Sequence, residues 1–265
     1  MDKHEQLIRP IREILLPLTV LLAFAACLRM VHSAFLPIVQ AYSWQSAKKP
    51  GNIAQAPHYR VLLQNAEMRV FEVTLQPGSE SFVWHENNFL IITLVASDII
   101  MWKGNESPVL HSMPPSGEIR FFLGKSAQGL RNDTRTEYRN ITVEFLDPRI
   151  TNYGYRNESE NWDYGASIAP SPVDPEGHFV NSLDLEKAVA SDVQLLPGES
   201  LPATKRASLV IAVTPLQLSL GAGKKVSLKP GEVLWRETGE TALTNSTPGR
   251  QRFALVEFRL PTEKY

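Results

Sequence analysis

The sequence predicts an all-β protein in which two similar domains follow one another behind an apolar N-terminal segment. The part after this segment contains an internal repeat: a Pro-Gly turn at Gly78 recurs at Gly198, and Val143-Glu144-Phe145 recurs as Val256-Glu257-Phe258. The separation between the copies falls from 120 to 113 residues along the chain. Landmarks that keep their order while the spacing drifts one way indicate a repeated folding unit with shorter loops in its second copy.

Composition excludes several classes of protein. The chain has 265 residues, 43% of them hydrophobic and 21% charged, with a formal net charge of −1. That balance is typical of a globular protein and gives no electrostatic reason to expect nucleic acid as a partner. Cys27 is the single cysteine and lies in the apolar N-terminal segment. The sequence therefore excludes disulfides and thiolate metal ligands from the rest of the chain.

Residues 1–41 read as a signal peptide or a membrane anchor helix. A polar start that carries basic residues is followed by fourteen uncharged residues, 14–27, and after Arg29 the chain is apolar again over 34–39. Fourteen residues suit the apolar region of a secretory signal, since a spanning helix needs roughly 20. We expect cleavage after Ala41; the alternatives are lipidation at Cys27 and an uncleaved anchor that contacts the membrane only through residues 14–39. Each predicts a secreted, periplasmic or membrane-anchored protein whose folded domains lie outside the cytoplasm.

Residues 42–57 are small and polar and predict a tether, and the first barrel is expected over 58–150. The alternation of polar and apolar residues over 68–75 indicates a half-buried strand, which a Pro-Gly turn ends. Further strands of the first copy are predicted at 58–63, 89–102 with a break at 96–98, 119–123 and 138–146. Glu144 and Glu257 recur between Val and Phe, and we expect both to be structural acids that face outward.

A linker is predicted over 151–175, rich in Tyr, Asn, Gly and Pro, and a second barrel over 176–265. Its strands are expected at 193–196, 209–220, 233–235 and 253–260, with one short helix around 182–190. Short strands separated by Gly, Pro and Asn turns indicate a sandwich or barrel. Asn132, Asn140 and Asn245 belong to Asn-x-Ser/Thr sequons, which we interpret as chance matches.

In both copies the frame resembles that of the cupin superfamily, and specifically of two-domain cupins. The first cupin motif opens at Gly78 and continues to Trp84-His85-Glu86-Asn87, and the second opens at Gly117-Glu118 and closes at Asn132. The resemblance implies two jelly-roll barrels in tandem. It also implies a metal held by two histidines spaced by one residue, a glutamate and a third histidine.

The metal ligands of the family are largely replaced. His85 is kept, but Asn87 stands at the second histidine and Gln128 at the third. The positions in the second copy hold Lys205, Ala207 and Thr241. Amides are poor ligands for Fe, Mn or Zn, so we expect no metal cofactor; if a divalent metal binds, His85 with Gln128 would hold it.

We therefore expect a non-catalytic protein with a structural role or a small polar ligand. The predicted site is the mouth of the first barrel, lined by Trp84, His85, Asn87, Arg120 and Gln128, with no catalytic residue. The alternative is a metal-dependent cupin enzyme, an oxygenase or isomerase that uses His85. A homodimer is a further expectation, although two joined barrels can already satisfy the family's usual interface internally.

Overall fold

The structure is a computed structural model that describes residues 49–106, 108–111, 115–151, 167–168, 179–203, 205–221, 223–239 and 241–259. The predicted leader, residues 1–41, and most of the predicted linker lie outside the described residues. Among the residues that are described, no helix has the length and apolarity needed to cross a membrane.

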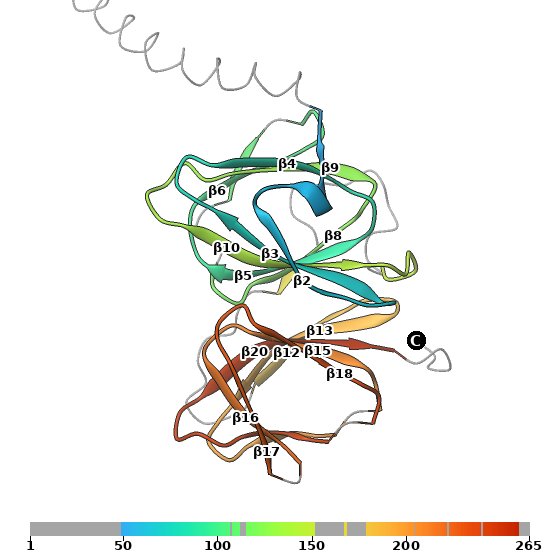
Figure 1. The fold of residues 1–265 in the computed structure, drawn as a ribbon, viewed down its shortest axis with the longest axis vertical. Coiled ribbons are helices and arrows are strands. Elements are labelled where there is room, and N and C mark those ends of the chain that lie inside the picture. The colour runs from blue at the N-terminus through green and yellow to red at the C-terminus, as the bar shows by residue number, and fades with distance from the viewer. Residues whose placement is uncertain are drawn as a thin grey trace, which may run out of the picture. The chain divides into compact units, whose positions relative to one another are not determined.

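The first barrel consists of two β-sheets, seen in the upper half of Figure 1. The larger sheet has the order β11-β8-β5-β10-β3-β2, and the smaller has the order β1-β4-β9-β6-β7. The strands are β1 (Gly51–Asn52), β2 (Tyr59–Gln64), β3 (Met68–Leu75), β4 (Glu80–His85), β5 (Phe89–Val95), β6 (Ile99–Lys103), β7 (Val109–His111), β8 (Ile119–Phe122), β9 (Ser126–Arg131), β10 (Tyr138–Phe145) and β11 (Ser167–Ile168).

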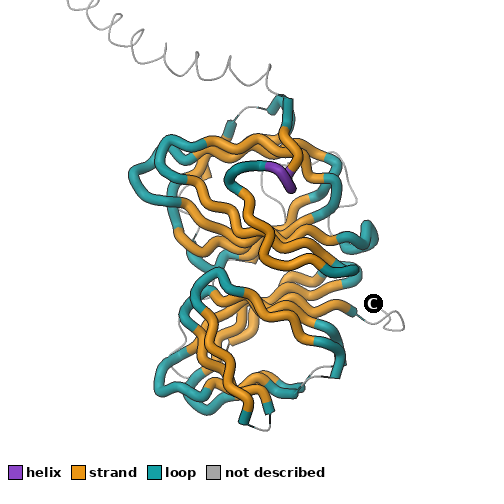
Figure 2. The backbone as a smooth tube through the Cα atoms, viewed as in Figure 1, coloured by secondary structure: helices purple, strands orange, loops and turns teal. Residues whose placement is uncertain are grey.

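The second barrel repeats this plan with sheets ordered β12-β13-β20-β15-β18 and β14-β19-β16-β17. Figure 2 shows strands throughout both barrels and one short helical turn, η2 (Ile53–Gln55). The strands are β12 (Phe179–Asp184), β13 (Ala188–Leu195), β14 (Ser200–Leu201), β15 (Ser208–Ala212), β16 (Leu216–Leu220), β17 (Lys224–Leu228), β18 (Val233–Arg236), β19 (Leu243–Asn245) and β20 (Gln251–Phe258).

The predicted all-β class is confirmed, and two local expectations are wrong. The helix expected around 182–190 is the hairpin of β12 and β13, because Leu183 and Ala190 pair across it and add apolar side chains to the core. The tether expected over 42–57 is folded at its C-terminal end. There β1 pairs in parallel with β4, and Ile53 is buried beside Val83.

The two barrels pack through their larger sheets, which face one another in Figure 1. One continuous apolar core joins them, with Leu90 and Val143 from the first barrel and Leu209 and Val256 from the second. Side chains alternate between the faces of a strand. Every second residue of these sheets therefore belongs to the shared core, and the residues between them face the inside of their own barrel.

Each barrel contains the same asparagine-centred turn. Asn132 is fully buried and its side-chain amide donates to the carbonyl oxygens of Leu75 (2.9 Å) and Thr136 (2.7 Å). Its side-chain oxygen accepts from both the backbone N–H and the hydroxyl of Thr134. In the second barrel, Asn245 makes the same four bonds with Leu195, Gly249 and Thr247.

The backbone at these turns repeats as well. Gly78 and Gly198 have φ of 75° and 80°, a region that glycine adopts without strain. Their N–H groups donate to the carbonyl oxygens of Asn132 and Asn245, at 2.7 and 2.9 Å. The paired asparagines thus fasten the Pro-Gly turn of each barrel to the strand end beside it.

A second repeated feature is an arginine–carboxylate ion pair of one barrel that contacts a turn of the other. Arg252 forms an ion pair with the buried Asp192 (2.9 Å) and donates to the carbonyl oxygen of Ser116 in the first barrel (3.0 Å). A Cβ at Gly117 would lie 2.3 Å from Nη2 of Arg252, so that position needs glycine both for space and for its φ of 86°.

The reciprocal contact joins Arg139 and Glu72 of the first barrel to Gly231 of the second. Arg139 forms an ion pair with Glu72. A Cβ at Gly231 would lie 3.3 Å from Nη2 of Arg139, and φ there is 90°. The Arg139–Glu72 pair occupies the positions in its copy that the Arg252–Asp192 pair occupies in the other.

Asn132→Ala and Asn245→Ala are each expected to lower the free energy of unfolding by about 2–3 kcal/mol, because each leaves buried backbone groups without partners. Urea unfolding followed by tryptophan fluorescence measures the change. Ser246→Ala, at an exposed neighbour of Asn245, serves as the control and should change stability by less than about 0.5 kcal/mol. A loss below about 1 kcal/mol in both asparagine variants would contradict the role given to these turns.

Candidate functional site

The inside of the first barrel is unusually polar along its larger sheet. The register sets Asn140 of β10 beside Thr93 of β5, and Thr142 beside Ile91, which in turn pairs with Arg120 of β8. Directly paired residues share a face of the sheet, so these side chains line the interior together. Six inward-facing side chains on this sheet are polar and buried: Thr93, Arg120, Tyr138, Asn140, Thr142 and Glu144.

The smaller sheet contributes the predicted histidine. His85 pairs with Ser126, and Val83 pairs with Gln128, so both His85 and Gln128 face the interior. His85 is 1% exposed, and its ring stacks on Phe89 of the other sheet with centroids 3.8 Å apart. Since Phe89 stacks in turn on Phe122, His85 belongs to an aromatic layer that bridges the two sheets.

The buried charges of this interior are paired. Arg120 contacts Glu118 at 2.6 Å, and Arg69 contacts Glu144 at 2.5 Å. Each pair satisfies the rule that a charge taken out of water requires an opposite charge and hydrogen bonds. The expectation that Glu144 faces outward is wrong: its side chain is fully buried because β10 presents it to the inside, opposite Arg69.

In the described interior, Nδ1 of His85, Nδ2 of Asn140 and Oε1 of Glu144 are buried without a hydrogen-bond partner. A buried polar atom without a partner costs about 1–3 kcal/mol. These atoms supply an amide donor, a carboxylate acceptor and an imidazole nitrogen to the interior, with Asn140 and Glu144 about 13 Å apart along β10.

The environment holds the interior imidazole and phenol neutral. Burial, with the charge of Arg69 as a smaller cause, lowers the pKa of His85 to about 3. Burial also raises the pKa of Tyr138 to about 12. Near neutral pH both groups can therefore give or accept hydrogen bonds, whereas a general base would need a pKa closer to the working pH.

The second barrel lacks this polarity. The positions of Thr93, Arg120, Asn140 and Thr142 are taken there by Ala212, Leu234, Phe253 and Leu255, which belong to or pack against its apolar core. Ser208 and Arg236, which pair between β15 and β18, are fully buried exceptions, and Arg236 donates to the carbonyl oxygen of Thr241. At the four compared positions the second barrel is therefore apolar where the first is polar.

Of the five predicted site residues, the structure brings His85, Arg120 and Gln128 into the interior. Trp84 is 41% exposed and donates from Nε1 to Glu86 on the outside. It cannot line the mouth together with His85, because adjacent residues of a strand face opposite ways. Asn87 lies in the turn after β4, beyond the strand pairing that directs His85 into the interior. We therefore leave Trp84 and Asn87 out of the candidate site.

Sequence reasoning missed five interior residues, namely Arg69, Thr93, Tyr138, Asn140 and Thr142. Three of them follow the period-two pattern of β10, in which Tyr138, Asn140, Thr142 and Glu144 alternate with apolar or long side chains. That alternation was available from the sequence. What could not be read from it is that both faces of β10 are buried, one by its own barrel and the other by the second barrel.

The donor set does not fit a metal centre of the cupin type. The described residues contain no group of three His, Cys, Asp or Glu side chains placed to hold a metal ion. The interior offers one imidazole, the amide of Gln128 and the carboxylates of Glu118 and Glu144, which Arg120 and Arg69 already engage. Guanidinium groups in the same interior oppose the approach of a cation.

Solved structures confirm the fold. A cupin 2 conserved barrel domain protein from Leptotrichia buccalis aligns with a TM-score of 0.54 at 10% identity, covering 80% of this chain and 92% of that one. AerE from Microcystis aeruginosa aligns with a TM-score of 0.56 at 10% identity, covering 80% of this chain and 97% of that one. A salicylate 1,2-dioxygenase variant from Pseudoaminobacter salicylatoxidans, in complex with gentisate, aligns with a TM-score of 0.55 at 13% identity. The alignment covers 85% of this chain and 80% of that one. No protein-family model matches the sequence, and no curated protein does.

His85 is expected to make the protein sensitive to acid. The unfolded chain binds a proton at His85 below about pH 6.5, whereas the folded protein does so only near pH 3. Its contribution to stability is therefore complete above pH 6.5 and is lost as the pH falls toward 3. Urea unfolding at pH 7 and pH 4.5 should show a larger loss for the wild type than for His85→Phe, which keeps the ring stack. Equal losses would show that His85 is protonated in the folded state.

Proposed function

We propose that the first barrel binds a small polar molecule without a metal, and that the second barrel is its structural support. The observation that carries this proposal is the polar interior of the first barrel, where atoms of His85, Asn140 and Glu144 are buried without a hydrogen-bond partner. The second barrel fills the matching space with apolar side chains. A fold that needed only a packed core would have no reason to treat its two copies differently.

The chemistry of the interior favours an uncharged ligand. Arg120 and Arg69 already form ion pairs with Glu118 and Glu144. A charged ligand would therefore find no unbalanced charge in the interior to pair with. An extended molecule with hydroxyl or amide groups could donate to Glu144 beside the aromatic layer of His85 and Phe89 and accept from Asn140, about 13 Å further along β10. Small-molecule sites commonly combine such apolar walls with a few convergent polar groups.

A metal-dependent enzyme that uses His85 is the alternative. The fold is compatible with it, since a salicylate 1,2-dioxygenase shares the architecture. The donor set favours binding without a metal, because the imidazole of His85 is already stacked in an aromatic layer and the described residues hold no group of three metal-ligating side chains.

We further propose that both barrels work outside the cytoplasm. The support is the basic start and the uncharged run over residues 14–27, together with a body free of cysteine. A leader of this kind directs export whether it is cleaved or kept as an anchor.

A ligand of the proposed kind should raise the melting temperature. At about one hundred times its dissociation constant it adds roughly 2.7 kcal/mol, which corresponds to about 5–10 °C for a unit of this size. A thermal-shift screen of sugars, polyols and small amides measures it. Asn140→Leu should abolish the shift, whereas Ser208→Ala, which alters a buried polar side chain of the second barrel, should leave it unchanged.

Two outcomes would count against this function. A shift that survives Asn140→Leu would place the ligand elsewhere. Metal analysis that finds about one equivalent of Fe, Mn or Zn, lost on His85→Ala, would favour the enzyme.

N-terminal sequencing of the protein isolated from the membrane and soluble fractions of its host tests the export proposal. Cleavage predicts a mature chain that begins at Tyr42, and an anchor predicts an intact Met1 in the membrane fraction only. An intact Met1 in the cytosolic fraction would contradict export.

A further inference from the structure

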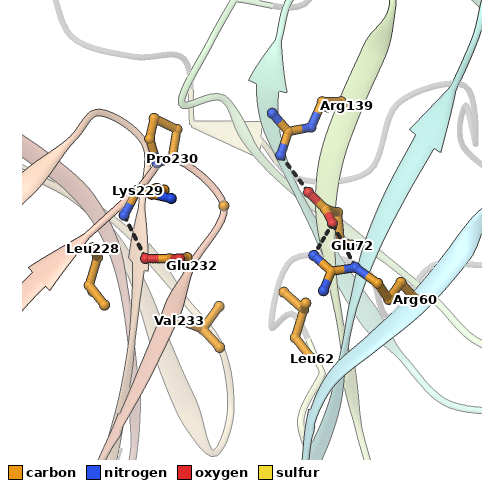
Figure 3. A pocket seen from close by; sticks show the side chains of 10 residues that line it. Arg60, Leu62, Glu72, Arg139, Leu228, Lys229, Pro230, Glu232 and Val233 are labelled. Atoms are coloured by element: carbon orange, nitrogen blue, oxygen red, sulfur yellow. Dashed lines mark hydrogen bonds and ion pairs between the residues drawn. The ribbon is translucent and has the colours of Figure 1, made fainter.

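A groove between the two barrels, separate from the interior of the first, has a volume of about 450 Å³. One wall comes from β2, β3 and β10 of the first barrel, and the other from residues 228–233 around the β17–β18 turn of the second (Figure 3). The volume lies within the range of small-molecule sites, about 300–1,000 Å³.

The charges in this groove leave an excess of one positive charge. Three cations, Arg60, Arg139 and Lys229, face two carboxylates, Glu72 and Glu232. Both carboxylates are already engaged. Glu72 accepts from Arg139 and from Arg60 (2.5 Å), and Glu232 accepts from the backbone N–H of Lys229 (2.7 Å).

Glu72 remains ionised in this setting. Burial acts to raise the pKa of Glu72, but the hydrogen bonds and charges of Arg139 and Arg60 outweigh it and hold the pKa below its usual value. The side chain of Arg60 is 71% exposed, so its outer N–H groups are accessible to a ligand in the groove.

Comparing the two copies of the repeat shows which charged residues of the groove the fold requires in both copies. Glu72, Arg139 and Gly231 have counterparts in Asp192, Arg252 and Gly117 across the interface. That reciprocal clamp is structural.

The two other cations have no such counterpart. The position equivalent to Arg60 is Asn181, which pairs with Asp192 across the strands as Arg60 pairs with Glu72. The position equivalent to Lys229 is Pro115, two residues before its turn glycine. Arg60 and Lys229 are therefore present on one side only, although the same clamp forms on both. The groove also has apolar walls, formed by the half-buried side chains of Leu62, Leu228 and Val233.

We infer that the groove is a second binding site, for a small organic monoanion with an apolar body. The anionic group lies between Arg60 and Lys229, and the body packs on Leu62, Leu228 and Val233. This site is independent of the ligand proposed for the first barrel, and the inference stands without it.

Hexanoate is the probe, titrated by calorimetry into the full chain in a buffer without carboxylates. Exposed ion pairs contribute up to about 1 kcal/mol, so Arg60→Gln and Lys229→Gln should each weaken binding roughly fivefold. Lys224→Gln removes an exposed lysine that does not line the groove and should leave affinity unchanged. His85→Phe should also leave it unchanged, which separates this site from the barrel interior.

The comparison ligand is 1-hexanol, which keeps the apolar body without the charge and should bind at least about fivefold more weakly. The inference is overturned if hexanoate shows no binding, if 1-hexanol binds equally well, or if the Arg60→Gln, Lys229→Gln double variant binds hexanoate as the wild type does. Equal melting temperatures of wild type and variants confirm that the changes act on binding and not on folding.

Discussion

The rest of the structure depends on the reciprocal clamp between the barrels, in which an arginine and its carboxylate partner from each barrel lie against a turn glycine of the other. Arg252 holds the carbonyl oxygen of Ser116, and the next two residues are Gly117 and Glu118. Glu118 in turn pairs with Arg120 inside the first barrel. The second barrel thus fixes the turn that carries one of the two buried ion pairs of the candidate site, and the shared apolar core fixes the sheet to which that turn belongs.

This arrangement explains why the two copies differ where they do. The faces that meet must remain complementary, so the clamps, the turn glycines and the buried asparagines are the same in both. The side chains inside each barrel do not meet the other barrel, so they need not be complementary to it. One has become polar around His85 and Asn140, and the other has become an apolar core with Phe253 and Leu255. A duplicated domain in which one copy supports and the other binds is the simplest physical account of that difference.

Much of the fold could be predicted from the sequence because its strongest signals are local. Pro-Gly turns, alternating strands and the drifting repeat are properties of neighbouring residues, and they predicted β3 to the residue. His85 and Gln128 were found by their place in that frame. Trp84 failed because one position along a strand reverses the face, and Glu144 failed because only the packing of two barrels shows that both faces of β10 are buried.

Asn132 and Asn245 lie in sequons that we interpreted as chance matches, but their shared structural role was not predicted. Asn132-Asp133-Thr134 and Asn245-Ser246-Thr247 match a modification motif, yet in both barrels the Asn and Thr side chains bond to one another within a buried turn. Their recurrence at the repeat spacing was the available signal. The helix expected over 182–190 failed for a related reason, since its alanines and leucines are apolar contacts of a sheet and not marks of helix propensity.

Differential scanning calorimetry tests the central claim most directly, namely that the two barrels are one cooperative unit built on a shared core and reciprocal clamps. The account predicts a single unfolding transition whose calorimetric enthalpy equals the van't Hoff enthalpy, the criterion of two-state behaviour. Two separable transitions, or a calorimetric enthalpy well above the van't Hoff value, would show that the barrels unfold independently and would contradict it.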